Sequence, residues 1–225
     1  MSVLAVIPAR GGSKRLPGKN LRVVGGKTLL QWAIESAWNA TRIDRIVVST
    51  EDREIEKAAY GVFFGLVGPN PVSAPPKPFD VLRRPLELAQ DTTPMIDVMR
   101  HALIETGYPD VLVCLQPTTP FRTAALVDDV LVELAKGDSV VTVHAGRPTG
   151  EVYVTERHLL LAGRLLGPRC VDYERPSPVV NIDGEYDLVR AERAWERALI
   201  HGRPHDAKMA ADHGALSWPP RGCAR

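Results

Sequence analysis

Short apolar runs alternate along the chain with segments that repeat apolar residues at helical spacing. The apolar runs predict strands at 3–7, 44–49, 62–67, 111–115, 139–144, 151–155 and 179–183. The helical spacing predicts helices at 29–40, 53–60, 93–105, 123–137 and 187–200. Strands and helices in this alternation are typical of a mainly parallel sheet covered on both faces, so the predicted fold is α/β.

Three of the predicted helices begin at residues that can cap free backbone N–H groups: Thr93, Thr123 and Asp187. Pro94 follows Thr93 at the first helical position, where the missing N–H of proline is tolerated. These residues set where we expect the helices to begin.

The chain of 225 residues suits one domain with a substantial core, which we place at residues 1–200. Two regions interrupt the alternating pattern. A proline-rich segment at 68–79 is predicted to be an inserted loop. The tail at 201–225 has no clear periodicity, and two interpretations stay open: it is disordered, or it docks on a neighbouring surface.

The charges nearly cancel, with 28 Lys and Arg against 27 Asp and Glu. Such a balance gives no overall field that attracts nucleic acid or a membrane surface, so we expect neither as a partner. We find no membrane-length apolar run and no N-terminal signal pattern, which predicts a cytoplasmic protein. The three cysteines and six histidines lack metal-ligand spacing.

Positive charge is concentrated in one loop directly after the first predicted strand. The loop holds two adjacent glycines and four cations: Gly11, Gly12, Arg10, Lys14, Arg15 and Lys19. Glycine lets backbone N–H groups approach an anion, and clustered Lys and Arg neutralise phosphate oxygens. The loop fits neither the P-loop nor the dinucleotide pattern. Its place after a strand still predicts a polyphosphate site, with a solvated surface loop as the alternative.

Five segments carry further distinctive motifs, at 7–20, 45–52, 84–92, 115–123 and 181–188. In this order they resemble the acylneuraminate cytidylyltransferase family, the CMP-sialic acid synthetases, and residues 15–19 are also similar to CMP-Kdo synthetases. Enzymes of this family transfer CMP from CTP to an acidic sugar and release pyrophosphate. The resemblance therefore implies a Rossmann-like, three-layer nucleotidyltransferase fold and a CTP-dependent nucleotidyltransferase.

The resemblance also implies roles for individual residues. Arg10, Lys14 and Lys19 are expected to act in catalysis, because cations stabilise the charge that develops as pyrophosphate leaves. Since Lys14 and Arg15 are adjacent, only one of the two is expected to face the ligand. The expected nucleotide-binding residues are Ala9, Arg10, Gly11, Gly12, Lys19, Asn20, Arg84, Asp91 and Thr92.

Asp183 is the expected ligand of a Mg²⁺ ion, with Asn181 beside it on the same face of the predicted strand 179–183. Mg²⁺ prefers oxygen ligands and can bridge the α-phosphate and the attacking oxygen. The sialic acid enzymes usually carry Asp at both positions, so Asn181 departs from the family pattern and weakens the predicted ligand set. Asp187 is interpreted as a helix cap rather than a ligand.

The expected acceptor-binding residues are Gln116, Arg122 and Arg147. Gln116 occupies the family position that faces the acceptor. Two interpretations of Arg122 stay open: it binds an acceptor anion through two hydrogen bonds, or it forms an ion pair near the helix cap at Thr123.

The region between 139–143 and the motif at 147–154 is much shorter here than in CMP-sialic acid synthetases, where it contributes to dimerisation and sugar binding. A reduced pocket leads us to expect a small anionic acceptor, a phosphonate such as phosphonoformate, of the kind activated in antibiotic and other natural-product biosynthesis. Two alternatives stay open: a CMP-nonulosonate or Kdo-type synthetase, and a catalytically silent nucleotide-binding protein, which Asn181 favours. A homodimer is typical of the family, although the shortened region weakens that expectation.

Overall fold

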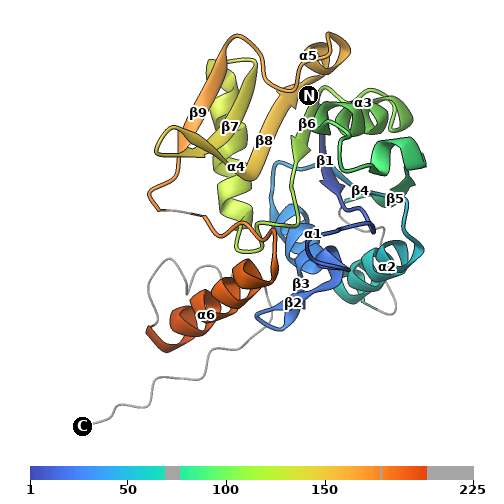
Figure 1. Ribbon diagram of the computed structural model, residues 1–225. Helices are drawn as coiled ribbons and strands as arrows, with labels where there is room; N and C mark the ends of the chain where they lie inside the picture. The colour runs from blue at the N-terminus through green and yellow to red at the C-terminus, as the bar shows by residue number, and fades with distance from the viewer. Residues whose placement is uncertain (69–76, 178, 202–225) are drawn as a thin grey trace.

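The computed structural model describes residues 1–68, 77–177 and 179–201, and its centre is a seven-stranded sheet (Figure 1). In spatial order the strands are β5 (Phe79–Arg83), β4 (Arg45–Thr50), β1 (Val3–Pro8), β6 (Val111–Cys114), β8 (Arg147–Glu156), β7 (Ser139–His144) and β9 (Cys170–Glu174). Strands β5, β4, β1 and β6 run parallel to one another, and so do β7 and β9. Only β8 is antiparallel to its neighbours β6 and β7 among these described strands, so the predicted mainly parallel sheet is confirmed.

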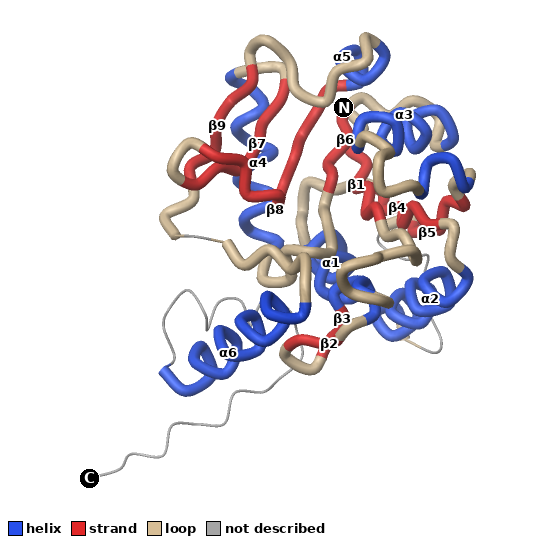
Figure 2. The backbone as a smooth tube through the Cα atoms, viewed as in Figure 1, coloured by secondary structure: helices blue, strands red, loops and turns tan. Residues whose placement is uncertain are grey.

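Helices cover both faces of this sheet (Figure 2). They are α1 (Leu29–Asn39), α2 (Arg53–Val67), α3 (Met95–Glu105), α4 (Ala124–Glu133), α5 (Arg157–Leu161) and α6 (Glu185–His201). Short helices η1 (Lys19–Leu21), η2 (Leu86–Ala89) and η3 (Leu134–Lys136) and a small hairpin, β2 (Val23–Val24) with β3 (Lys27–Thr28), complete the described elements. None of the described helices is long and apolar enough to cross a membrane.

Strand β1 shows why the core has two halves. Val3, Ala5 and Ile7 belong to the cluster formed with α1, α2 and α4, whereas Leu4 and Val6 belong to the cluster formed with α3 and α5. Alternate side chains of a strand point to opposite faces, so an uninterrupted apolar strand needs cover on both sides. The three-layer α/β fold is therefore confirmed.

A smaller core joins α6 to the N-terminal loop region. Leu16, Val24, Ile182 and Ala191 are buried together there. Gly25 has a φ of 60°, and a Cβ on it would lie 2.7 Å from the Trp195 ring. Glycine at this position therefore permits both the turn and the close packing of α6 on the hairpin.

The strand predicted at 62–67 is wrong, because this segment is the second half of α2. Ile55, Ala59, Val62 and Leu66 all contact the same core cluster, and their spacing of four, three and four residues is helical. The short apolar run at the end of the segment resembles a buried strand when its neighbours are not counted.

The sequence analysis predicts neither of the two edge strands of the sheet, β5 and β9. β5 lies at the end of the segment that we interpreted as an inserted proline-rich loop, and β9 falls in a stretch without assignment. Their residues are only partly buried, so their polar and apolar pattern is weak. Residues 69–76 of the proline-rich segment and the tail from 202 onward lie outside the described residues.

The predicted helix caps are correct in one case of three. The Thr123 hydroxyl accepts from Leu126 N at 3.1 Å, as expected. The Thr93 prediction is wrong: α3 begins after Pro94, and the Thr93 hydroxyl donates instead to the Glu87 carbonyl at 2.9 Å. Asp187 accepts backbone N–H groups, but from inside the first turn of α6 rather than from the residue before it.

Candidate active site

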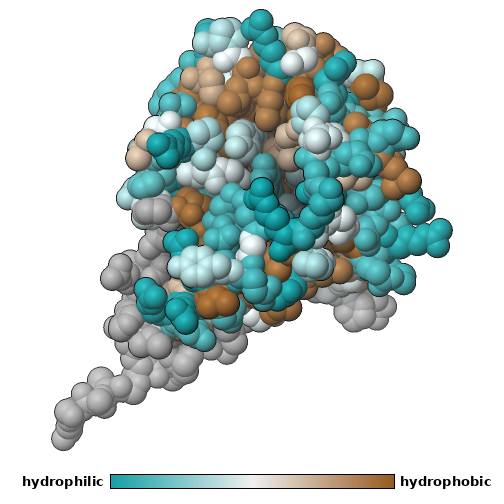
Figure 3. Space-filling model, viewed as in Figure 1, coloured by the Kyte–Doolittle hydropathy of each residue, from teal (hydrophilic) through white to brown (hydrophobic). Residues whose placement is uncertain are grey.

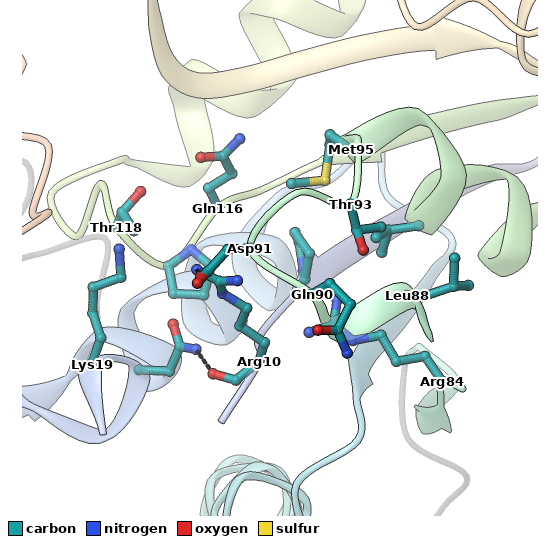
Figure 4. A pocket seen from close by; sticks show the side chains of 14 residues that line it. Arg10, Lys19, Arg84, Leu88, Gln90, Asp91, Thr93, Met95, Gln116 and Thr118 are labelled. Atoms are coloured by element: carbon teal, nitrogen blue, oxygen red, sulfur yellow. Dashed lines mark hydrogen bonds and ion pairs between the residues drawn. The ribbon is translucent and has the colours of Figure 1, made fainter. Parts of the chain in front are cut away.

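The carboxyl ends of β1, β4, β5 and β6 meet at one edge of the sheet, and a pocket of about 230 Å³ opens there. Polar residues that follow three of these strands, Arg10, Arg84 and Gln116, line the pocket together with Lys19 and Asp91 (Figure 4). Figure 3 shows the hollow on this face, bordered largely by hydrophilic side chains. The structure thus brings together three of the five motifs that resemble the family, those at 7–20, 84–92 and 115–123.

The loop after β1 is closed by Asn20. The Asn20 side chain, only 5% exposed, donates from Nδ2 to the Arg10 carbonyl at 2.8 Å. This bond anchors η1 to the start of the loop, and η1 carries Lys19. Asn20 therefore shapes the loop in addition to lining the pocket.

Two of the predicted catalytic cations share one carboxylate. Arg10 Nη2 lies 2.5 Å from one oxygen of Asp91, and Lys14 Nζ lies 2.7 Å from the other. The hydrogen bonds from Lys14 and Arg10 hold the pKa of Asp91 below its usual range. An anionic ligand that uses these cations has to compete with Asp91.

Glycines and Ala9 have distinct places in the loop. Ala9 is fully buried and donates its backbone N–H to the Ser49 carbonyl at 2.9 Å, so its side chain belongs to the core. A Cβ on Gly11 would lie 2.1 Å from Asp52 Oδ2, so glycine is needed there for packing. A Cβ on Gly12, by contrast, would meet no described atom within 4 Å, so this side of the loop is open.

Arg84 forms the opposite wall of the pocket. It is 5% exposed, and its Nε donates to Glu51 Oε2 at 2.9 Å. Burial lowers the pKa of Arg84, and the Glu51 carboxylate opposes that shift. Arg84 Nη2 has no hydrogen-bond partner among the described residues, which leaves a buried donor available to a ligand.

The segment that carries the predicted metal ligands is not a strand. Residues 179–183 have no ladder partner in the described structure, and the segment is attached by the bond from Ile182 N to the Thr118 carbonyl at 2.8 Å. Ile182 is buried while Asn181 and Asp183 are exposed, so the two predicted ligands do flank the same buried residue. Lys19 Nζ lies 3.2 Å from Asp183 Oδ1, which places this carboxylate at the pocket rim.

Gln116, predicted to bind the acceptor, and Asn181, predicted to bind the metal, both have amide side chains close to Gly150. A Cβ on Gly150 would lie 3.8 Å from Gln116 Oε1 and 4.0 Å from Asn181 Nδ2. Gly150 has a φ of 81°, a conformation that favours glycine. The absence of a side chain at Gly150 keeps open the space between the two amides.

Arg122, one of the predicted acceptor-binding residues, is 1% exposed and is not among the residues that line the pocket. Its Nη1 donates to the carbonyls of Glu151 at 2.6 Å and Gln116 at 3.3 Å, and to Thr119 Oγ1 at 3.0 Å. Burial lowers the pKa of Arg122 to about 10. The guanidinium therefore supports the loop that presents Gln116.

Arg147 and Thr92, two more of the predicted site residues, are also absent from the pocket lining. Arg147 is exposed at the start of β8, and Thr92 is exposed beside Asp91. The sequence analysis gave no site role to Met95 and Thr118 of the lining or to Glu51 behind it. Their positions next to predicted residues were the available signal, since neighbours on a short loop commonly share a site.

Comparison with known proteins places the chain in a family. The cytidylyltransferase family model matches residues 4–164. The chain is 32% identical over 214 residues to the CMP-N,N'-diacetyllegionaminic acid synthase of Legionella pneumophila, an alignment that covers 91% of this chain and 84% of the relative. It is 36% identical over 121 residues to the N-acylneuraminate cytidylyltransferase of Escherichia coli, covering 53% of this chain and 25% of that protein.

Solved structures agree on the fold. A CMP:2-keto-3-deoxy-manno-octonic acid synthetase complexed with CTP aligns with a TM-score of 0.65 at 16% identity, covering 88% of this chain and 99% of the other. A Mycobacterium tuberculosis protein in complex with manganese aligns with a TM-score of 0.60 at 13% identity, covering 86% and 100%. The chain therefore belongs to the cytidylyltransferase family, in its acylneuraminate-like branch, and is a CTP-dependent nucleotidyltransferase.

Proposed function

We propose that the protein transfers CMP from CTP to a sugar acid of the nonulosonate or Kdo type and releases pyrophosphate. The observation that carries this proposal is the meeting of the basic loop with the Gln116 and Asn181 amides at one edge of the sheet. The names of the relatives favour a sugar acid as the acceptor. The phosphonate acceptor expected from the shortened region has no support among these relatives, so a sugar acid replaces it.

The cations serve the phosphate end of the reaction. During transfer, negative charge grows on the α-phosphate oxygens and on the departing pyrophosphate. Arg10 and Lys19 line the pocket, and Lys14 forms an ion pair with Asp91 of the lining. Their positive charges are therefore in place before the reaction begins. Such preorganisation lowers the cost of the charge development. CTP would draw Arg10 and Lys14 away from Asp91 as its triphosphate enters.

A divalent cation fits the pocket rim at Asp183. The part of the chain that the structure describes contains no group of three His, Cys, Asp or Glu residues able to hold an ion. Asp183, with a side chain 52% exposed, and the nearby Asn181 amide offer oxygen ligands only. Mg²⁺ suits such a site, because it usually takes one or two protein carboxylates and completes its shell with phosphates and water. When bound, the ion would neutralise phosphate charge.

The acceptor end is built from neutral donors and acceptors. Gln116 and Asn181 each present an amide, which can both donate and accept hydrogen bonds. Hydroxyl and acylamino groups of a sugar acid match such partners, and Gly150 leaves room for them. Arg122 keeps the Gln116 loop in place from inside the protein.

The testing experiment measures pyrophosphate release from CTP, ATP, GTP and UTP in the presence of Mg²⁺ or Mn²⁺. Acceptors would include legionaminic, N-acylneuraminic and pseudaminic acids, Kdo and phosphonoformate. We expect release with CTP and one of the sugar acids. Release with phosphonoformate alone would overturn the acceptor class, and release with no pair would overturn the proposed reaction.

A further inference from the structure

Glu51 is a largely buried carboxylate that lies behind the pocket and accepts hydrogen bonds from the loop after β1 and from Arg84. It directly follows β4, and its side chain is 12% exposed. Oε1 accepts the Gly11 N–H at 2.8 Å, and Oε2 accepts the Arg84 Nε–H at 2.9 Å. One residue thus connects the phosphate loop after β1 with the guanidinium after β5.

The turn that carries Glu51 is held at several points. Thr50 Oγ1 accepts from Asp52 N at 3.1 Å, and Asp52 Oδ1 caps α2 by accepting from Glu54 N at 2.7 Å and Ile55 N at 3.1 Å. Capped helix starts and buried strand ends have little freedom. Glu51 therefore projects from a fixed support.

The partners of Glu51 depend on it. Gly11 packs so closely on Asp52 that a Cβ there would clash, so the loop has little freedom to move toward another acceptor. Arg84 is almost fully buried, lies near Arg10, and has an unpartnered Nη2 among the described residues. A buried guanidinium without its carboxylate would have to shift toward water or another anion.

We propose that Glu51 is a positioning residue that sets the spacing between the glycine-containing phosphate loop and Arg84, and so determines how well the pocket accepts CTP. This inference rests on the proposed function. Glu51 itself is not among the residues that line the pocket, so it is not expected to touch the substrate. Its effect on the reaction passes through Gly11 and Arg84.

The test compares Glu51→Gln with Asp138→Asn. Asp138 is a buried carboxylate, 3% exposed, that accepts from Ser139 Oγ and Arg169 N away from the pocket, so its variant loses a comparable internal anion. For Glu51→Gln we expect KM for CTP to rise roughly tenfold or more, with a smaller change in kcat, because a lost hydrogen bond to a charged group changes binding by about that factor. Asp138→Asn should lower the melting temperature and leave KM for CTP unchanged.

Glu51→Asp provides a second variant in case the Gln form does not fold. It keeps the charge but is one methylene shorter, so it can reach only one of the two partners, and KM for CTP should again rise. KM for CTP is measured at a temperature at which each variant is folded. If either Glu51 variant then has the wild-type KM, the positioning role is wrong. Failure of the wild-type protein to release pyrophosphate from CTP would instead count against the proposed function, whatever the Glu51 variants do.

Discussion

At the scale of single residues, Lys19 has the least exposed side chain of the three predicted catalytic cations. Its side chain is 17% exposed, and Nζ lies 3.2 Å from the Asp183 carboxylate at the rim. Its position is set by η1, which the Asn20 side chain bonds to the Arg10 carbonyl. Lys19 can therefore meet the triphosphate without first being ordered.

Replacing Lys19 with Ala should lower kcat/KM for CTP by roughly a hundredfold or more, since a preorganised charge acts on the developing anion. Steady-state pyrophosphate release measures this effect. Lys136→Ala is a matched control, because Lys136 also pairs with a carboxylate, Glu133 at 2.6 Å, but stands on the surface away from the pocket. Equal activities of the two variants would contradict the role given to Lys19.

Asp91 pairs with Arg10 and Lys14, so under the proposed function we expect it to compete with the triphosphate for these cations. Asp91→Asn should lower the apparent Kd for pyrophosphate by about two- to tenfold, a modest factor because these ion pairs are partly exposed. Isothermal titration calorimetry measures this Kd. Weaker binding in the variant would show that Asp91 assists the anion instead of competing with it.

The competition between Asp91 and pyrophosphate for Arg10 and Lys14 should depend on pH, because only the charged Asp91 carboxylate competes. The pKa of Asp91 is lowered by Lys14 and Arg10, so the carboxylate stays charged and paired until the pH falls below the usual range of an aspartate. The difference in pyrophosphate Kd between wild type and Asp91→Asn should therefore be constant near neutral pH. It should shrink only as the pH falls through that lowered pKa, where the wild-type carboxylate becomes neutral.

At the scale of elements, α6 connects the segment that carries Asp183 to the hairpin of β2 and β3. Trp195 of α6 lies at ring-centroid distances of 5.2 Å from Trp32 and 5.9 Å from Phe121, and Glu192 of α6 accepts from Gly25 N at 3.0 Å. Asp183 stands just before this helix. The position of Asp183 thus depends on aromatic packing at a distance from the pocket.

Trp195→Ala should destabilise the protein by about 2 kcal/mol or more, because removal of the half-buried indole leaves a cavity beside the Trp32 and Phe121 rings. We also expect a higher Mg²⁺ concentration for half-maximal activity, since Asp183 loses its support. Thermal unfolding and a metal titration measure the two effects. Trp195→Phe keeps much of the packing and serves as the control. If Trp195→Ala needs the same Mg²⁺ concentration as the wild type, α6 does not determine the position of Asp183.

Some elements could be predicted from sequence and others could not, for physical reasons. The strand at 3–7 is apolar on both faces, and this pattern identifies a central strand without further information. The segment at 62–67 could not be distinguished from a strand, because a six-residue apolar run lacks the length that reveals helical spacing. Edge strands such as β9 contact the core on one side only, so their sequence carries a weaker pattern.

At the scale of the whole molecule, the order of motifs predicted which segments would meet, but not which atoms. Arg10 and Gln116 follow strands that the apolar pattern predicts, and parallel strands bring their carboxyl ends to one edge. Arg84 follows β5, which the pattern does not predict, so only the family resemblance indicated its place in the site. The burial of Arg122 could not be predicted, because its acceptors include the carbonyl of Glu151, 29 residues away in the chain. The bonds from Glu51 likewise join residues 40 and 33 positions distant.

Because the pocket draws on β1, β5, β6 and the segment before α6, a ligand that fills it should stabilise the entire fold rather than one loop. At a CTP concentration a hundred times Kd, with Mg²⁺ present, the free energy of unfolding should rise by about 2.7 kcal/mol. For a domain of this size that corresponds to a melting temperature higher by roughly 5–10 °C. Thermal unfolding of wild type and Lys19→Ala at the same CTP concentration measures the effect. Only the melting temperature of the wild type should rise, because Lys19 joins the loop after β1 to Asp183. A similar rise in both proteins would mean that CTP binds without engaging the loop after β1.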